Sequence, residues 1–262
     1  MKQYIFSTIF MVISFSISAQ PKQLKTDVEQ AIQNGQKWMK NNKASLGIES
    51  YIVYNLLERR FQQPKVANKK QLLSDNEEEA KALKPFYRLM DNNASLTKEE
   101  LAKVEGRIDK LVTKAIWCDQ YPLPDNYLAD LEVLYLRGKH RLTHAYLATL
   151  FIQENNNSII ETAEYKELEQ KITKSMQEFL TSNDVTSDVW IEAIALMLYA
   201  GQHQKISDAY IQRVLEAQDA STGGWKNYPN SAETNHHTTA LALWALLEYN
   251  NKPIKNIRWI QH

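Results

Sequence analysis

Four segments of the chain are apolar on every side of a helix, and no other feature restricts the fold as strongly. They read SYIVYNLL from Ser50, HAYLATLFI from His144, EAIALMLYAG from Glu192 and TALALWALL from Thr239. A helix without a polar side has to be surrounded by other parts of the protein, because any face left in water would expose apolar side chains. We therefore expect these segments to form an inner layer of helices.

Other segments carry a single apolar stripe at helical spacing, which is typical of helices that bury one face only. These stripes lie within residues 28–39, 101–115, 168–180 and 211–215. The inner segments at His144, Glu192 and Thr239 start about 47 residues apart, the length of one helical hairpin in repeat proteins. We predict an all-α fold, an α/α toroid-like array of helical hairpins in which outer amphipathic helices surround inner apolar helices.

The first 19 residues, MKQYIFSTIFMVISFSISA, predict a secretory signal peptide. They combine one lysine with an apolar core and a small residue before Gln20, and they are too short for a membrane span. We expect cleavage after Ala19, export to the periplasm or the extracellular space, and no integral membrane segment in the mature chain. Residues 20–262 suit a single domain, in which the charged residues 62–84 predict an exposed connector or weak helix.

The charge of the chain is balanced, with 31 basic and 31 acidic residues. A near-neutral chain gives no electrostatic reason to expect nucleic acid as a partner. Cys118 is the only cysteine, so an intramolecular disulfide is excluded, and a buried free thiol is the default expectation. Nothing in the sequence predicts the oligomeric state.

The segment YIQRVLEAQDASTGGWKNYPNSAETNHHTTALALWALLEY resembles the repeat of the squalene cyclase and protein prenyltransferase superfamily. The likeness lies in an outer helix ending in Gln218, a loop with Gly223, Gly224 and Trp225, and the inner helix that follows. It covers about the last third of the chain and implies an α/α toroid. The catalytic motifs of the known families are missing, because there is no Asp-x-Asp-Asp run, no Asp-x-Cys zinc pair and no thioester motif. The resemblance implies the scaffold without its chemistry, and no cofactor is predicted.

Polar residues stand at equivalent first turns of the inner segments, at Glu49, His144, Glu192 and the pair His236 and His237. In a toroid the inner helices run parallel, so these side chains are expected to surround one mouth of a central cavity, with His144, Glu192 and His237 within about 10 Å of one another. The partial positive charge of helix N-termini keeps a nearby histidine neutral, as a general base requires. His236 and His237 point about 100° apart, and we favour His237 as the one facing the cavity because it resembles the histidine of the prenyltransferase helix. The structural alternative is that ordinary helices also prefer acids in their first turn.

Two further pairs of residues lie four positions apart. Asp188 and Glu192 have the spacing of paired carboxylates for acid–base work, although an N-cap at Asp188 and a first-turn acid at Glu192 is the simpler interpretation. His140 and His144 have the spacing of two metal ligands on one helical face, but no third ligand follows at a fixed spacing. The sequence therefore predicts no metal site.

Aromatic residues are candidates for lining a cleft that binds sugars or apolar chains, namely Trp190, Trp225, Tyr228 and Trp244. Burial in the core is the alternative, and it applies to Trp244 above all. Trp225 is the strongest ligand-binding candidate, because a Gly-Gly pair lets its loop fold the indole over a helix end. A structural clamp between repeats is the alternative there. Glu49 and His236 would add polar contacts to the bound ligand.

These features predict an exported protein that binds, or acts on, an extended ligand through a polar cluster at the mouth of a central cavity. A glycan and an isoprenoid-like apolar chain both fit, and export favours the glycan. If the protein is an enzyme, the simplest mechanism is lysis or hydrolysis of a polysaccharide, with His237 or His144 as the base and Glu192 or Asp188 as its partner. The alternative is a non-catalytic ligand- or protein-binding module on the same scaffold, and the sequence leaves open whether the chain is an enzyme.

Overall fold

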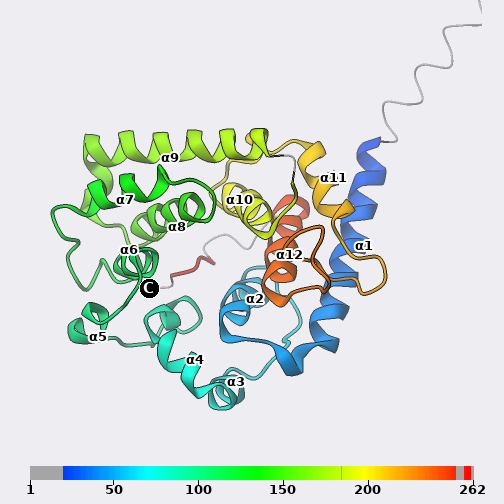
Figure 1. Cartoon of the computed structure of the whole chain (residues 1–262), viewed down its shortest axis with the longest axis horizontal. Coiled ribbons are helices and arrows are strands. Elements are labelled where there is room, and N and C mark those ends of the chain that lie inside the picture. The colour runs from blue at the N-terminus through cyan, green and yellow to red at the C-terminus, as the bar shows by residue number, and fades with distance from the viewer. Residues whose placement is uncertain (1–19, 184, 252–256, 261–262) are drawn as a thin grey trace, which may run out of the picture.

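The computed structural model describes residues 20–183, 185–251 and 257–260, and within them the fold is all-α, as predicted (Figure 1). Pairing of the β type is limited, in this part of the chain, to isolated bridges from Trp225 to Gln218 and to Asn235. The α-helices and the short 3-10 helices, labelled η, are α1 (Gln20–Asn41), η2 (Lys43–Ser45), α2 (Ile48–Arg60), α3 (Lys69–Asp75), α4 (Glu77–Ala82), η3 (Lys84–Leu89), α5 (Lys98–Ala102), α6 (Arg107–Ile116), α7 (Tyr127–Tyr135), α8 (His140–Glu154), η4 (Ser158–Glu161), α9 (Ala163–Ser182), α10 (Asp188–Tyr199), η5 (His203–Lys205), α11 (Asp208–Glu216) and α12 (His236–Asn250).

The helices are arranged around a common centre (Figure 1). α2 packs against α12, α12 against α10, α10 against α8, and α8 against α6. The 3-10 helix η3 contacts both α6 and α2, so this succession of contacts returns to its starting point. Outside it, α1 packs on α12, α9 lies along α8 and α10, and α7 lies against α8. The four segments that are apolar on every side form α2, α8, α10 and α12, and all four belong to the inner set.

The inner helices α10 and α12 are buried along almost their whole length. Every residue from Trp190 to Leu198 in α10 and from Thr238 to Glu248 in α12 is buried. The prediction that helices without a polar side are surrounded is therefore confirmed for both. Side chains cap their first turns, since Ser187 accepts a hydrogen bond from the Trp190 N–H and Asn235 accepts one from the Thr238 N–H. The N-cap of α10 is thus Ser187, and Asp188 is the first residue of the helix.

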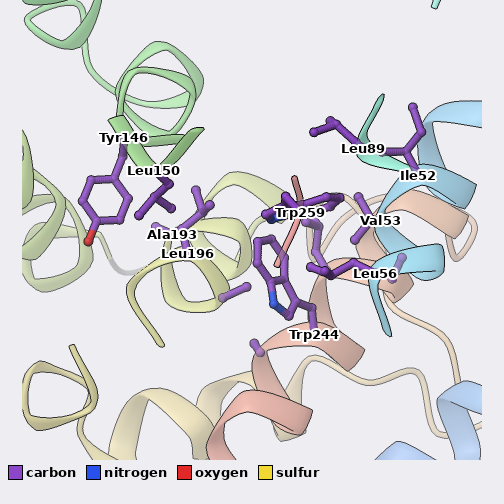
Figure 2. Packing of buried hydrophobic residues seen from close by; sticks show 14 of the residues in the cluster. Ile52, Val53, Leu56, Leu89, Tyr146, Leu150, Ala193, Leu196, Trp244 and Trp259 are labelled. Atoms are coloured by element: carbon purple, nitrogen blue, oxygen red, sulfur yellow. The ribbon is translucent and has the colours of Figure 1, made fainter. Parts of the chain in front are cut away.

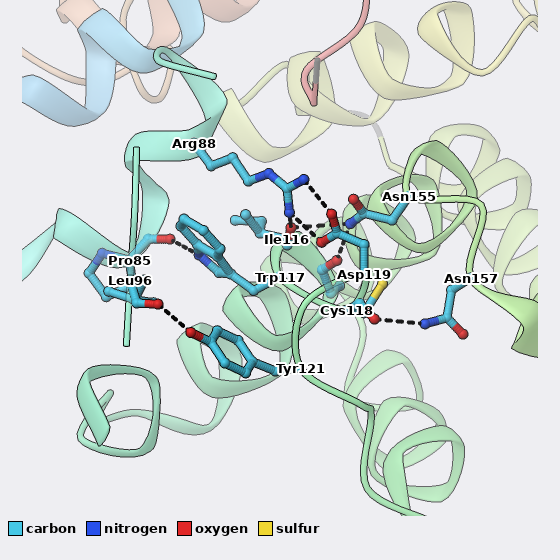
Figure 3. Close-up of polar contacts among 11 residues, drawn as sticks. Pro85, Arg88, Leu96, Ile116, Trp117, Cys118, Asp119, Tyr121, Asn155 and Asn157 are labelled. Atoms are coloured by element: carbon cyan, nitrogen blue, oxygen red, sulfur yellow. Dashed lines mark hydrogen bonds and ion pairs between the residues drawn. The ribbon is translucent and has the colours of Figure 1, made fainter. Parts of the chain in front are cut away.

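The 3-10 helix η3 lies between α2 and α6, and polar contacts connect it to the end of α6 (Figure 3). Arg88 forms an ion pair with Asp119 and donates a hydrogen bond to the Ile116 carbonyl. Trp117 Nε1 donates to the Pro85 carbonyl at 2.7 Å. Because the Arg88 side chain is buried, its charge requires these partners, and they hold η3 against α6.

Two segments differ from the sequence prediction. The stripe within residues 101–115 forms two helices, α5 and α6, because Gly106 between them has a φ of 77°, a left-handed conformation that interrupts a right-handed helix. Residues 62–84, predicted as a connector or weak helix, contain the short helices α3 and α4. The helix α7 was not predicted.

Residues 1–19, predicted as a signal peptide, lie outside the described residues. α1 begins directly after them, at Gln20. In the described part of the chain, no helix has both the length and the apolar character needed to cross a membrane.

Candidate functional site

A cavity of about 700 Å³ lies between α2, η3, α6, α8, α10 and α12. This size is within the range of pockets that bind small molecules. Most of its wall is apolar, and Figure 2 shows part of that wall around Val53, Leu196 and Trp244. We call this apolar part the chamber. The polar residues Glu49, His144, Glu192 and His237 also line the cavity, and we call them the mouth.

Helical spacing explains why polar and apolar residues of one helix share the cavity. On α8 the lining residues are His144, Leu147 and Phe151, and on α10 they are Glu192 and Leu196. Residues three, four or seven positions apart lie on one face of a helix, so a polar residue in the first turn is followed on the same face by apolar residues in the next turns. α2 and α12 repeat the pattern. The four helices therefore present polar first turns at one end of the cavity and apolar side chains below.

The mouth contains two pairs of a histidine and a carboxylate. His144 Nδ1 lies 4.0 Å from Glu192 Oε1, and His237 Nε2 lies 3.9 Å from Glu49 Oε1. The two pairs differ in solvation, because the Glu192 side chain is 9% exposed and the Glu49 side chain is 71% exposed. The pair of His144 and Glu192 is therefore the one in which charge is costly.

His144 is held in a defined neutral form. Burial lowers the pKa of His144, because desolvation disfavours the imidazolium. Its Nδ1 lies 2.9 Å from the His140 carbonyl oxygen, which can only accept, so Nδ1 carries the hydrogen and Nε2 keeps a lone pair. The His140 ring stacks on His144 with centroids 3.9 Å apart, and burial together with the neighbouring His144 also lowers the pKa of His140. Two neutral imidazoles thus stand at the mouth.

Glu192 is shifted in the direction of its protonated form. Burial raises the pKa of Glu192 and is the largest influence on it. A hydrogen bond from Thr143 and the nearby His237 and His140 lower this pKa, and Asp188 raises it, each by less than burial does. A carboxyl group donates a hydrogen bond when it holds its proton and only accepts when it does not. The raised pKa of Glu192 therefore widens the pH range in which the mouth can donate to a bound polar group.

The remaining side of the cavity opening, from α4 to the start of α6, carries charges of both signs. Lys81, Lys103, Glu105 and Asp109 line it. Charges of both signs therefore surround the opening, and the rim shows no excess of one sign that would select a strongly charged ligand.

Asp188 and His236 are predicted site residues that do not line the cavity. Asp188 Oδ1 accepts a hydrogen bond from the Val189 N–H at 2.8 Å, and its effect on the mouth is electrostatic, through Glu192. His236 Nε2 lies 2.8 Å from the Asn42 carbonyl oxygen, and its ring lies 4.7 Å from that of Trp38. His236 therefore fastens α12 to the end of α1, and of the two adjacent histidines only His237 lines the cavity.

The aromatic candidates also lie elsewhere than predicted. Trp225 and Trp190 are fully buried in the core, and each indole N–H donates to a backbone carbonyl, so neither is available to a ligand. Trp225 reaches this position because a Cβ at Gly224 would lie 2.9 Å from the Trp38 ring, and only glycine leaves room for the loop. Tyr228 is exposed and does not line the cavity. Trp244 is buried in the core, as expected, and also lines the cavity.

A second polar set, at the last turns of the inner helices, was not predicted. Arg60 Nε donates to Glu248 Oε1 at 2.7 Å, and Tyr199 Oη hydrogen-bonds Glu154. Arg60 Cζ lies 4.6 Å from the centre of the Tyr199 ring, which connects the two pairs. We call these four residues the far end, because the inner helices place their first turns at the mouth. The signal was present in the sequence, since Glu248 follows His237, and Arg60 follows Glu49, after eleven residues, which is three helical turns and the same face.

Neither a metal nor a thiol is part of the candidate site. Among the described residues, no group of three or more His, Cys, Asp or Glu side chains is placed to hold a metal ion. Cys118 is buried, as expected, and burial raises the pKa of its thiol to about 11, so it stays protonated.

No family model, no curated protein and no solved structure matches this chain. The resemblance to the cyclase and prenyltransferase repeat therefore stays a prediction, and the function has to be inferred from the cavity itself.

Proposed function

We propose that the protein binds an amphiphilic small molecule, whose apolar chain fills the chamber and whose polar head contacts the mouth. The observation that carries this proposal is the division of one cavity into an apolar chamber and a polar mouth. Burying an apolar chain is favourable by about 0.8 kcal/mol for each CH₂ group, whereas water in such a chamber finds few hydrogen-bond partners. The imidazole of His144 and the buried carboxyl group of Glu192, whose pKa is raised, suit a hydroxyl or carboxyl head.

The chamber favours an apolar chain over the glycan that export had suggested. A bound sugar needs many hydrogen-bond partners along its length, because each buried hydroxyl left without one costs free energy. The wall below the mouth consists of side chains such as Leu147, Leu196 and Leu241, which offer none. Trp190 and Trp225, the indoles expected to stack on sugar rings, are inside the core.

Displacement of a fluorescent apolar probe by straight-chain alcohols, carboxylic acids and amines of equal length tests this proposal. We expect saturable binding with one ligand per chain, and the three series identify the head group. Leu147→Glu places a charge in the chamber wall at a partly exposed position and should abolish binding. Leu136→Glu is the matched control, because Leu136 is 68% exposed and lies outside the cavity. Wild-type protein that displaces no probe with any ligand would refute the proposal.

Acid–base chemistry on the bound head group is a second candidate function. It is favoured by the opposite shifts in one pair, with the pKa of Glu192 raised and that of His144 lowered, because a bound head group would then meet one side chain that tends to hold a proton and one that tends to accept it. In this case Glu192→Gln and His144→Gln would bind the ligand and lose turnover. Retained turnover in both variants would refute this role of Glu192 and His144, and a wild-type protein that binds ligand without turnover would be a non-catalytic binding protein.

The arrangement of the fold and the location of the protein are part of the same proposal. The closed succession of contacts from α2 through α12, α10, α8, α6 and η3 supports a toroid-like array, which the resemblance to the cyclase and prenyltransferase repeat also implies. Export rests on residues 1–19 alone, and N-terminal sequencing of the protein secreted by its host, with Gln20 expected first, tests it.

A further inference from the structure

The far end of the inner helices is occupied by the segment Ile257–Ile260. Figure 2 shows Trp259 of this segment beside Trp244, Val53 and Leu56. Side chains of the inner helices hold the backbone of all four residues. Arg60 and Arg59 donate to the carbonyls of Ile257 and Arg258, the second at 2.9 Å. The Trp259 N–H donates to Tyr199 Oη at 3.0 Å, and the Ile260 N–H donates to Glu154 Oε2 at 2.9 Å.

The residues that hold the segment have other partners as well. Arg60 is paired with Glu248, Tyr199 with Glu154, and Arg59 donates to the Leu89 carbonyl at 2.8 Å. If the segment left, these charges would keep those contacts, so no buried ion would lose its counter-charge. The far end is therefore arranged in advance for a peptide backbone and does not depend on the segment to neutralise it.

One side chain of the segment enters a specific pocket. The Trp259 ring packs edge-on against Trp244 and Phe151, with centroid distances of 5.4 and 6.4 Å. Its Nε1 is buried without a hydrogen-bond partner among the described residues, so the segment does not match the pocket fully. Trp259 lines both the chamber and a second cavity of about 210 Å³ behind it, near Arg88 and Asn92. The indole thus separates two spaces in the interior of the protein.

We propose that the far end is a peptide-binding site and that Ile257–Ile260 is its intramolecular ligand. The site recognises an extended backbone through four side chains, and it selects a bulky aromatic residue followed by an aliphatic one. Contacts from side chain to backbone do not depend on the peptide sequence, so the aromatic pocket supplies the selectivity. The inference does not rest on the proposed function, although Trp259 also lines the chamber.

Binding of the labelled peptide NIRWIQH, residues 256–262, tests the proposal by fluorescence anisotropy. A chain ending at residue 256 should bind the peptide saturably, and the wild-type chain should not, because its own segment fills the site. Replacing the peptide's tryptophan by alanine should weaken binding by at least about tenfold, through loss of the buried aromatic contacts. A scrambled peptide of the same composition is the control. A folded shortened chain that ignores the peptide, or that binds the alanine peptide equally well, would overturn the proposal.

A full-length variant covers the case in which the shortened chain does not fold. Trp259→Ala keeps the full length of the chain and removes the indole, so the added peptide should displace the weakened segment from the site. Circular dichroism establishes that the variant is folded. Hydrogen exchange in the wild type supplies a second measurement, because the Trp259 and Ile260 amides should be protected by Tyr199 and Glu154. A folded Trp259→Ala chain that does not bind the peptide, or unprotected amides in the wild type, would count against an occupied peptide site.

Discussion

Replacing Arg60 alone should destabilise the protein about as much as, or more than, replacing Arg60 and Glu248 together. The Glu248 side chain is 1% exposed and that of Arg60 is 10% exposed. Glu248 accepts hydrogen bonds from Arg60 Nε at 2.7 Å, from Arg60 Nη2 at 3.2 Å and from Trp244 Nε1 at 3.2 Å. Arg60→Met keeps the volume of the side chain but leaves a buried carboxylate with one neutral donor. Such a loss costs about 3–5 kcal/mol of unfolding free energy.

The double variant removes both charges. Glu248→Leu alone leaves the Arg60 guanidinium buried without its counter-charge, again at a cost of about 3–5 kcal/mol. Arg60→Met with Glu248→Leu leaves only two neutral groups without partners, Trp244 Nε1 and the Ile257 carbonyl, at about 1–3 kcal/mol each. The losses of the two single variants sum to about 6–10 kcal/mol and should therefore exceed the loss of the double variant, about 2–6 kcal/mol, by about 4 kcal/mol.

Urea unfolding followed by circular dichroism and tryptophan fluorescence measures these differences. The dependence of the free energy on urea should be the same in all four proteins, so that midpoints report stability alone. A single variant that is unfolded without urea supports the argument if the double variant folds. Losses that simply add, or a single variant that loses less than about 1 kcal/mol, would show that Arg60 and Glu248 are solvated separately and would refute the reasoning.

Three further outcomes follow from the structure. Trp259→Ala should join the chamber to the second cavity. Affinity for straight-chain ligands rises about fourfold with each CH₂ group and should level off at a longer chain in this variant than in the wild type. The same maximal chain length for both proteins in displacement assays would contradict this. The lowered pKa of His144 contributes stability that is present above pH 6.5, its ordinary pKa, and is lost as the pH falls through the lowered pKa. Urea midpoints should therefore fall more between about pH 7.5 and pH 5.5 in the wild type than in His144→Gln. The control His203→Gln, on the surface, should match the wild type. Gly223→Ala should cost about 1–3 kcal/mol more than Gly138→Ala, since both have positive φ but only Gly223 would bring a Cβ within 3.0 Å of the α1 backbone; equal melting temperatures would contradict it.

The inner helices could be predicted because their burial depends only on composition around the helix. A segment such as residues 192–201 has no polar side, and no arrangement in water leaves it exposed at acceptable cost. The break at Gly106 was harder to predict, because glycine is tolerated inside helices and its left-handed φ is decided by the surrounding structure. The short helices α3 and α4 likewise have weak local signals and depend on what they pack against.

The mouth could be predicted in part, because parallel helices bring their first turns together. His144, Glu192 and His237 line one cavity for this reason. The position of Trp225 could not be predicted, since a Gly-Gly loop permits an indole to lie over a cavity or to enter the core, and the choice depends on the space beside Trp38. The role of Trp259 was equally hidden, because its contacts join residues far apart in the sequence.

The charged residues of the inner helices lie near the ends of each helix and not along one side of it. This distribution explains why the cavity is apolar in its middle. A charge in the middle of a surrounded helix would have no partner and no water, whereas a charge in its first or last turn meets the equivalent turn of the next helix. Glu192 therefore faces His144, and Glu248 faces Arg60. Between the two levels, residues 193–198 of α10 and 240–247 of α12 are all apolar. An interior built in this way cannot satisfy a ligand that is polar throughout, because the middle level has nothing to offer it. The same cost that confines the charges of the protein to the ends of its helices is the reason why we propose a ligand that is apolar in its middle and polar at the mouth.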